Sequence, residues 1–144
     1  MRNGDFVIDK EKGTILFFQK YHGKMMFGES KCHKNDKFNV IVGQLIAMKR
    51  CELKIRKIEI EAVRNAIEYL KTWKTHYFKV GQERLLEHYI QFSHETLRNH
   101  LNHVRELRKD IEELDKGTYI LPENAENLKY EYIKGSMKLV PLNE

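Results

Sequence analysis

The chain has 144 residues, of which 41% are hydrophobic and 33% are charged. This length and composition are typical of one globular domain with its own core. No apolar run approaches the roughly 20 residues that a membrane-spanning helix needs. The first residues lack the apolar core of a signal peptide. We therefore expect a single cytoplasmic domain over residues 1–144 that does not bind membranes.

The charge is distributed unevenly along the chain. Residues 1–81 carry 17 Lys and Arg against 9 Asp and Glu, whereas residues 82–144 carry 9 against 12. A basic surface of this kind attracts anions. The alternative is that the basic and acidic halves neutralise each other within the fold or between subunits.

The N-terminal part predicts an antiparallel β-meander. The segment 6–8 is a short strand, and Gly13 permits the turn that follows it. Residues 14–21 are β-branched and aromatic, which is typical of a central strand. Gly23 then allows a tight turn into a third strand at 24–27.

The middle of the chain predicts two long helices. Asn39 is placed to cap the first, and no proline interrupts residues 39–77. Gly81 separates this helix from a second one at about 82–116, which Gly117 ends. The second helix has the 3-4 spacing of a coiled-coil seam at Leu86, Ile90, Ser93, Leu97, His100, Val104, Leu107, Ile111 and Leu114.

The first helix carries two apolar stripes instead of one. The first consists of Ile41, Leu45, Met48, Ile55, Ala62, Ala66, Tyr69 and Trp73, and the second of Leu53, Ile60, Val63, Ile67 and Leu70. A helix with two stripes contacts a helix on one side and a sheet or a second subunit on the other. These stripes exceed what one hairpin covers, so we expect a homo-oligomer.

The C-terminal part returns to period-2 patterning. Residues 118–122 are expected to be extended, and 128–133 and 137–142 alternate on either side of a turn, which predicts a C-terminal hairpin or two edge strands. The predicted fold class is α+β: an N-terminal antiparallel meander, a long antiparallel helical hairpin and short C-terminal strands. Sheet residues are expected within 5–31 and 118–142, and the hairpin within 39–116.

Neither the histidines nor the cysteines form a recognisable reactive or metal-binding set. His94, His100 and His103 lack the HExxH spacing of zinc enzymes, and His100 fits better as a single polar layer in the seam. Cys32 and Cys51 have no CxxC partner for zinc, and a bridge between them is not expected in the cytosol. No glycine-rich phosphate loop is present. We therefore expect no enzymatic activity, no metal and no cofactor.

The basic residues around the start of the first helix are the best candidates for a function. Free N–H groups at a helix start favour anions, arginine forks bind phosphate, and aromatic rings stack on bases. The expected ligand-binding residues are Lys31, Lys37, Phe38, Asn39, Lys49, Arg50, Lys54, Lys57, Tyr130 and Tyr132. The alternative is that these cations form a solvated face paired with the acidic second helix. For Arg50, that alternative is a structural ion pair at the strand–helix junction.

Residues 28–50 contain the pattern Gly28-x-Ser30-x-Cys32, then Asp36-x-Phe38-Asn39, then Gly43-x-x-Ile46-Ala47-x-x-Arg50. This pattern resembles a stretch of small accessory proteins of phages and prophages of Gram-positive bacteria. The resemblance covers about residues 5–55 and extends to the Thoeris anti-defence proteins. Those are oligomers that sequester cyclic ADP-ribose signals or cyclic oligonucleotides. Asn35 stands where that group has a proline, and the second helix has no counterpart in the pattern.

The resemblance implies a phage-encoded, non-enzymatic anti-defence protein in the host cytoplasm that sequesters an anionic nucleotide signal. Arg50 is the basic position of the pattern that carries over. Two alternatives stay open: an inhibitor or adaptor that binds a host defence protein through the helical hairpin, and a nucleic-acid-binding protein. Cations that converge with a tyrosine would indicate a pocket, whereas a flat stripe would indicate a protein or polymer partner.

Overall fold

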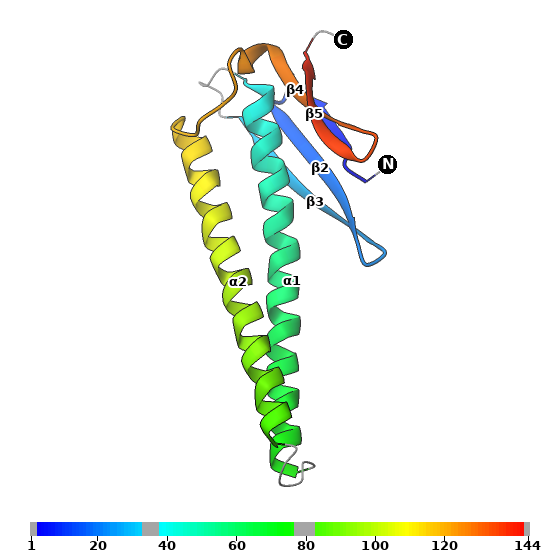
Figure 1. The fold of residues 1–144 in the computed structure, drawn as a ribbon. Coiled ribbons are helices and arrows are strands. Elements are labelled where there is room, and N and C mark those ends of the chain that lie inside the picture. Colours follow the sequence, from blue (N-terminus) through cyan, green and yellow to red (C-terminus); the bar gives the residue numbers. More distant parts are fainter. Residues whose placement is uncertain (1–2, 33–37, 77–82, 143–144) are drawn as a thin grey trace. The chain divides into compact units, whose positions relative to one another are not determined.

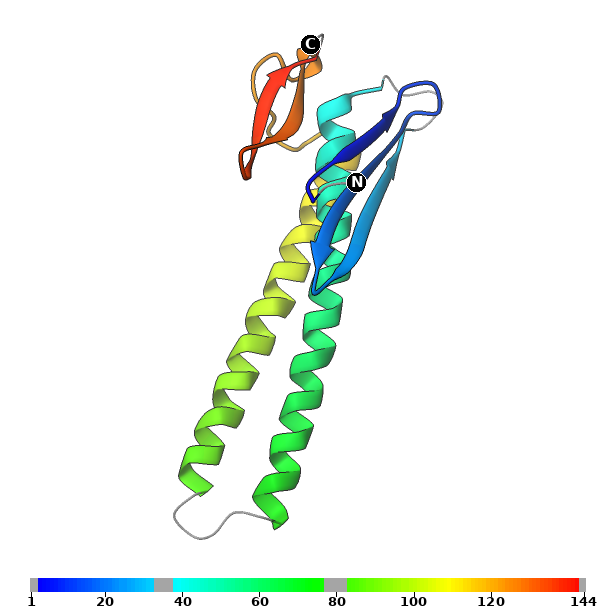
Figure 2. The same ribbon diagram turned by 90° about the vertical axis from the view of Figure 1, so that its right-hand side faces the viewer.

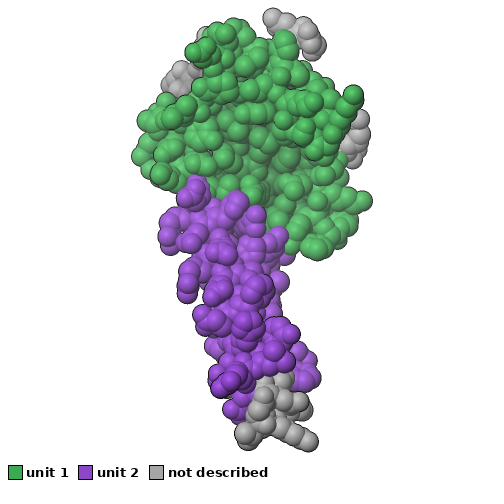
Figure 3. Space-filling view, viewed as in Figure 1, with its two compact units in different colours: residues 1–55, 107–144 green, residues 56–106 purple. Residues whose placement is uncertain are grey.

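The structure is a computed structural model, which describes residues 3–32, 38–76 and 83–142. The fold is α+β, as the sequence predicts. Along the chain, three antiparallel strands come first, two long helices follow, and two further antiparallel strands come last (Figure 1). The chain divides into two compact units, a finer division than the single expected domain. Unit 1 comprises residues 1–55 and 107–144, and unit 2 comprises residues 56–106 (Figure 3).

The N-terminal strands of unit 1 form a three-stranded antiparallel sheet. Its strands are β1 (Phe6–Asp9), β2 (Thr14–Tyr21) and β3 (Lys24–Lys31), in the order β1-β2-β3. Glycines with positive φ make the turns, at Gly13 (φ 68°) and Gly23 (φ 77°). The meander is confirmed, and β3 runs four residues further than the sequence patterning indicated.

The helices begin and end within a residue of their expected bounds. Helix α1 spans Val40–His76 and helix α2 spans Glu83–Lys116. The expected cap is present, because Asn39 Oδ1 accepts a hydrogen bond from the backbone N–H of Val42 at 3.3 Å. Gly117 (φ 77°) ends α2, and the N–H of Thr118 bonds back to the carbonyl of Glu113.

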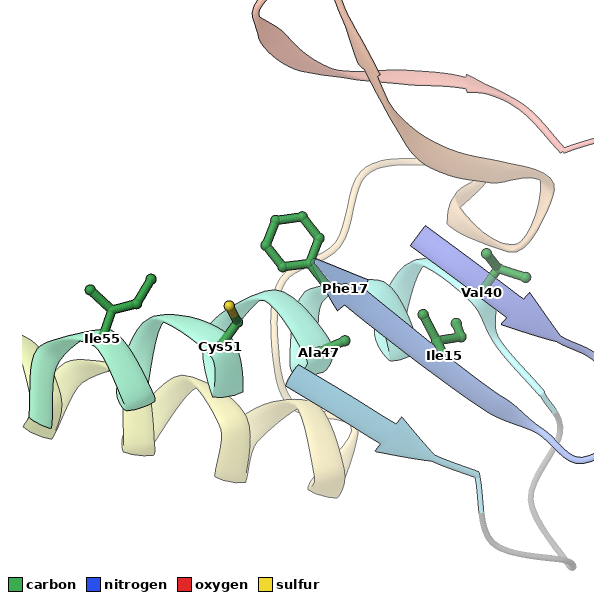
Figure 4. Close-up of a cluster of buried hydrophobic side chains, with 6 residues drawn as sticks. All are labelled: Ile15, Phe17, Val40, Ala47, Cys51 and Ile55. Carbon is green, nitrogen blue, oxygen red and sulfur yellow. The ribbon is translucent and has the colours of Figure 1, made fainter. Parts of the chain in front are cut away.

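The first part of α1 packs on the three-stranded sheet through apolar side chains (Figure 2). Ile15 and Phe17 point from β2 toward a row of helix residues consisting of Val40, Ala47, Cys51 and Ile55 (Figure 4). All six are at most 6% exposed. Of these helix residues only Ile55 belongs to the first predicted stripe, and Leu45 of that stripe packs with Ile46 and Leu114 in a second cluster. The first predicted stripe therefore covers the sheet only in part. Cys32 and Cys51 form no disulfide in the described part of the chain.

The C-terminal strands pair only with each other among the described residues. Strands β4 (Leu128–Ile133) and β5 (Ser136–Pro141) form a two-stranded antiparallel sheet of their own. Residues 118–127, which the sequence placed in the sheet region, hold the short 3-10 helix η1 (Ala125–Asn127) instead of a strand. Pro122 lacks a backbone N–H for pairing, and Asn124 has a left-handed φ of 57°, which turns the chain.

In unit 2, α1 and α2 pack on each other through the predicted seam. Ile60, Ile67, Leu86 and Val104 are at most 7% exposed. His100 forms the expected polar layer: its Nε2 lies 3.3 Å from Glu59 Oε2, and its Nδ1 lies 3.0 Å from Arg56 Nη1. Because arginine only donates, Nδ1 accepts and Nε2 carries the hydrogen that faces Glu59. Within the described ranges, neither α1 nor α2 has a segment long and apolar enough to cross a membrane.

Candidate functional site

Lys49 of the predicted site forms a contact within unit 1. Its Nζ lies 3.1 Å from Asp110 Oδ2 on α2 and 5.6 Å from the centre of the Tyr119 ring. The pair is partly shielded, with side chains 17% and 30% exposed. This contact matches the alternative in which the basic first helix is neutralised by the acidic second helix.

Arg50 and Lys54 bond to the outer edge of β3. Arg50 Nη1 donates to the carbonyl oxygen of Glu29 at 2.8 Å, and Lys54 Nζ donates to that of Phe27 at 2.8 Å. Lys54 Nζ also lies 4.6 Å from the centre of the Phe27 ring. Since β3 is an edge strand, these carbonyls have no strand partner in the sheet. Cations that cover them hinder edge-to-edge pairing with another chain.

The glycines and the alanine of the residue 28–50 pattern contribute to packing between β3 and α1. A Cβ added to Gly28 would lie 2.0 Å from the carbonyl oxygen of Ala47 and 2.5 Å from the N of Cys51. A Cβ added to Gly43 would lie 2.6 Å from Ile15 Cδ1. The pattern therefore marks a close strand–helix crossing, which is a structural requirement in its own right.

Three predicted site residues meet in one cavity of unit 1, which we call the α1 cavity. Lys31 comes from the end of β3, while Phe38 and Asn39 come from the residues before α1. The C-terminal end of α2 supplies the opposite wall with Asp115, Lys116 and Gly117. The cavity has a volume of about 280 Å³. It opens beside the first turn of α1, whose N–H groups have no acceptor within the helix.

Lysines outnumber carboxylates among the residues that line the α1 cavity. The lining includes two lysines, Lys31 and Lys116, and one acidic residue, Asp115. Lys116 Nζ lies 2.6 Å from Glu112 Oε1, and this hydrogen bond and charge raise the pKa of Lys116 and lower that of Glu112. Both side chains are well exposed, so the pair is weak and Lys116 remains available to a competing anion.

The two predicted tyrosines lie elsewhere in unit 1. Tyr130 and Tyr132 line a second cavity of about 210 Å³ with Gly4 and Gln44. Gln44 is fully buried and pairs with the backbone of Tyr130 twice: Nε2 donates to its carbonyl at 2.8 Å, and Oε1 accepts from its N–H at 2.6 Å. Burial, with Tyr119 nearby, raises the pKa of the Tyr130 hydroxyl. Tyr130 thus belongs to the packing between α1 and β4.

The ten predicted residues therefore do not form one site. Lys57 is exposed and belongs to unit 2, and Lys37 lies outside the described residues. Sequence reasoning missed Lys116 and Gly117, because only the folded chain brings the end of α2 to the start of α1. It also missed Gln44. The one signal for this residue in the sequence is that a polar side chain lies on the same side of the helix as Ile41 and Leu45.

The histidines and cysteines do not gather into a metal site in the described part of the chain, where no cluster of three or more His, Cys, Asp or Glu residues has suitable geometry. Cys51 is buried, and burial raises the pKa of its thiol.

Comparison with protein-family models, with curated proteins and with solved structures finds no match for this chain. The resemblance to phage accessory proteins therefore remains an expectation from the pattern at residues 28–50.

Proposed function

We propose that this chain is a non-enzymatic binding protein that holds a small anionic ligand of the nucleotide type in the α1 cavity. The observation that carries the proposal is the meeting of Lys31, Phe38 and Asn39 with Lys116 in that cavity. These residues come from three separate segments of the chain. The first three are among the ligand-binding residues that the sequence predicts.

The chemistry of the cavity suits a phosphate next to a planar ring. Against Asp115 and the carbonyl end of α2 on the opposite wall, the cavity offers an anion two lysines and the first turn of α1. Phe38 is half-buried, packs in part against the core of unit 1 and also lines the cavity, where the exposed part of its ring is available to a base. A volume of about 280 Å³ is close to the lower limit of small-molecule sites, which run from roughly 300 Å³ upward. A mononucleotide or a compact cyclic nucleotide fits this description better than a large oligonucleotide.

The biological setting follows the resemblance and is part of the proposal. A protein that binds a nucleotide signal without changing it lowers the free concentration of that signal by mass action. The Thoeris anti-defence proteins, to which the resemblance of the residue 28–50 pattern extends, act in this way on cyclic ADP-ribose signals. We propose the same action here, in the host cytoplasm.

The proposed site does not include the basic residues Lys49, Arg50 and Lys54 of α1. Lys49, Arg50 and Lys54 already hold Asp110 and the edge of β3, so a ligand there would compete with contacts of the fold. The same contacts weaken the alternative of a nucleic-acid-binding protein, because they leave fewer cations for a phosphate backbone. The other alternative, a protein partner for the hairpin, concerns unit 2 and is a separate question.

The test is calorimetric titration of the full chain with cyclic nucleotides, cyclic ADP-ribose isomers and short single-stranded DNA. Loss of one charge-assisted contact costs about 1.5 to 3 kcal/mol, so Lys31→Ala is expected to weaken binding roughly 10- to 100-fold. Lys24→Ala, which removes an exposed lysine at the other end of β3, is the matched control and is expected to bind normally. Wild-type protein that binds nothing on the panel would contradict the proposal.

A further inference from the structure

Each helix of unit 2 carries an exposed stripe beside the buried seam, and on α1 it is the C-terminal half of the first predicted stripe. On α1 the stripe is Ala62, Ala66, Tyr69 and Trp73, and on α2 it is Leu85, Tyr89, Phe92 and Thr96. Seven of these eight side chains are exposed, and Thr96 is half-buried. Tyr69 is 62% exposed, Tyr89 53% and Phe92 63%. These are large apolar surfaces for a chain with so much charge.

Both stripes lie on the same side of the helix pair. In each helix the stripe precedes the seam by one residue, as Ala66 precedes Ile67 and Phe92 precedes Ser93. One residue is a rotation of about 100° around a helix axis. Because the helices are antiparallel, the same rotation along each chain brings both stripes to one face. We call this the uncharged face.

The two stripes also meet at the same level of the hairpin. The contact between Glu59 and His100 fixes how the antiparallel helices are aligned. Continuing that alignment places Tyr69 level with Ile90, and Trp73 level with Leu86. The aromatic residues of both helices therefore form one patch, in which the Tyr69 and Trp73 rings lie 5.8 Å apart.

Charged residues are concentrated on the other side of unit 2. None of the eight stripe residues is charged, although 33% of the chain is. The helix positions that point away from the uncharged face include Glu61, Arg64, Glu68, Glu87, Arg98 and Arg105, all exposed. Depletion of charge with enrichment of aromatic residues is the composition of the core of a protein–protein interface.

We propose that the uncharged face binds the same face of a second copy of this chain, so that the two helix pairs form a four-helix bundle. A helix that presents two adjacent apolar stripes is typical of such bundles, where each helix contacts two neighbours. The occupant must itself offer a face without charge. The chain supplies one, and a two-fold axis pairs it with itself.

The sizes of the side chains fit a two-fold axis that crosses the helices. The aromatic residues lie toward the end of unit 2 at which α1 stops and α2 begins, while Ala62 and Ala66 lie further back along α1. In an antiparallel pair of hairpins, the aromatic side chains of one copy lie over the alanines of the other. Large side chains facing small ones fill a core without voids.

The area of the patch is in the range that a dimer needs. A buried aromatic side chain contributes about 150 to 250 Å², so the exposed parts of the four rings amount to on the order of 400 Å². A standard interface buries about 800 Å² on each partner. The rings thus supply about half, and the alanines, Leu85 and the surrounding polar residues complete the interface.

The experiment is sedimentation equilibrium of the full chain, whose monomer mass is 17.3 kDa. We expect a wild-type mass of two chains at tens of micromolar. Phe92→Glu places a charge in the centre of the face and is expected to raise the dimer dissociation constant at least 100-fold. Gln91→Glu adds the same charge to the exposed neighbouring position, outside the uncharged face, and is the matched control that remains dimeric.

Circular dichroism of each variant checks that the helices remain folded. If Phe92→Glu does not fold, Ala66→Glu tests the same face at a small exposed residue. A wild-type monomer at every concentration would overturn the proposal and leave the face to another protein. An oligomer whose mass Phe92→Glu or Ala66→Glu leaves unchanged in a folded chain would overturn it too, because the copies would then meet elsewhere.

Discussion

Gly28 is required by the close approach of β3 to α1. Its missing side chain lets the backbone of Ala47 come within 2.0 Å of where a Cβ would be. Gly28→Ala would push strand and helix apart, and overpacking of this kind costs about 3 kcal/mol. We expect chemical denaturation to show that loss. Glu29→Ala, an exposed neighbour on the same strand, is the control and should stay near wild type.

Cys51 predicts a specific dependence of stability on pH. Burial raises the pKa of its thiol above the ordinary value of 9.0 in the folded chain. Above that pH the unfolded chain releases this proton while the folded chain keeps it. The free energy of unfolding is therefore fully maintained below about pH 9 and falls as the pH rises further.

Denaturant titrations of wild type and Cys51→Ala at pH 8 and pH 10 test this dependence. The variant is expected to lose less stability between the two pH values than the wild type. Tyr130 contributes a decline of the same sign, since burial raises its pKa as well, so some decline remains in the variant. Equal declines in both proteins would contradict the role of Cys51.

At the scale of elements, Gln44 joins α1 to β4. It satisfies both backbone groups of Tyr130 from a position that is fully buried. Gln44→Ala removes both hydrogen bonds from the part-buried N–H and carbonyl of Tyr130, at a cost of about 2 kcal/mol. We expect faster hydrogen exchange at the Tyr130 amide, with little change in β2. Gln91→Ala, an exposed glutamine on α2, is the control.

Arg50 and Lys54 fix the edge of β3 to α1 through two backbone carbonyls. Each hydrogen bond is exposed, so its loss is expected to cost about 1 kcal/mol or less. The variant with both Arg50→Ala and Lys54→Ala should melt at a lower temperature and aggregate faster, because the edge becomes open to pairing. Lys57→Ala removes an exposed cation of unit 2 and is expected to do neither.

The elements themselves could be predicted from the sequence because their signals are local. Asn39 caps α1, Gly117 ends α2, and the β-branched and aromatic segment 14–21 is the central strand. The partners of Arg50 and Lys54 could not be predicted, because they depend on where α1 crosses β3. The sequence left open whether the C-terminal strands form a hairpin of their own or two edge strands, because period-2 patterning does not say which strand is the neighbour. The structure has the hairpin, β4–β5.

At the scale of the whole molecule, the two units have different surface chemistry. Unit 1 has a core between a sheet and a helix, and a cavity lined by lysines. Unit 2 has a seam with a polar layer at His100 and Glu59, and an aromatic face without charge. The sequence indicated two apolar stripes on α1 and predicted an oligomer. That α2 carries a matching stripe becomes apparent only when the two helices are aligned.

The candidate site was only partly predictable for the same physical reason. Residue type and helix position identified Lys31, Phe38 and Asn39. Charge alone grouped Arg50 and Lys54 with them, although a cation next to a strand edge is as well satisfied by a carbonyl oxygen as by a phosphate. Long-range packing decides between the two, and local sequence contains no record of it.

The most direct test of the α1 cavity as the ligand site is calorimetric titration of three proteins with the nucleotide panel: wild type, Lys31→Ala and Arg50→Ala. If the ligand binds in this cavity, we expect Lys31→Ala to weaken binding roughly 10- to 100-fold. Arg50→Ala is expected to bind as the wild type does and to lose only stability. The contrary result is that Arg50→Ala abolishes binding and Lys31→Ala does not. It would place the ligand at the basic residues Lys49, Arg50 and Lys54 of α1 and contradict the α1 cavity as the site.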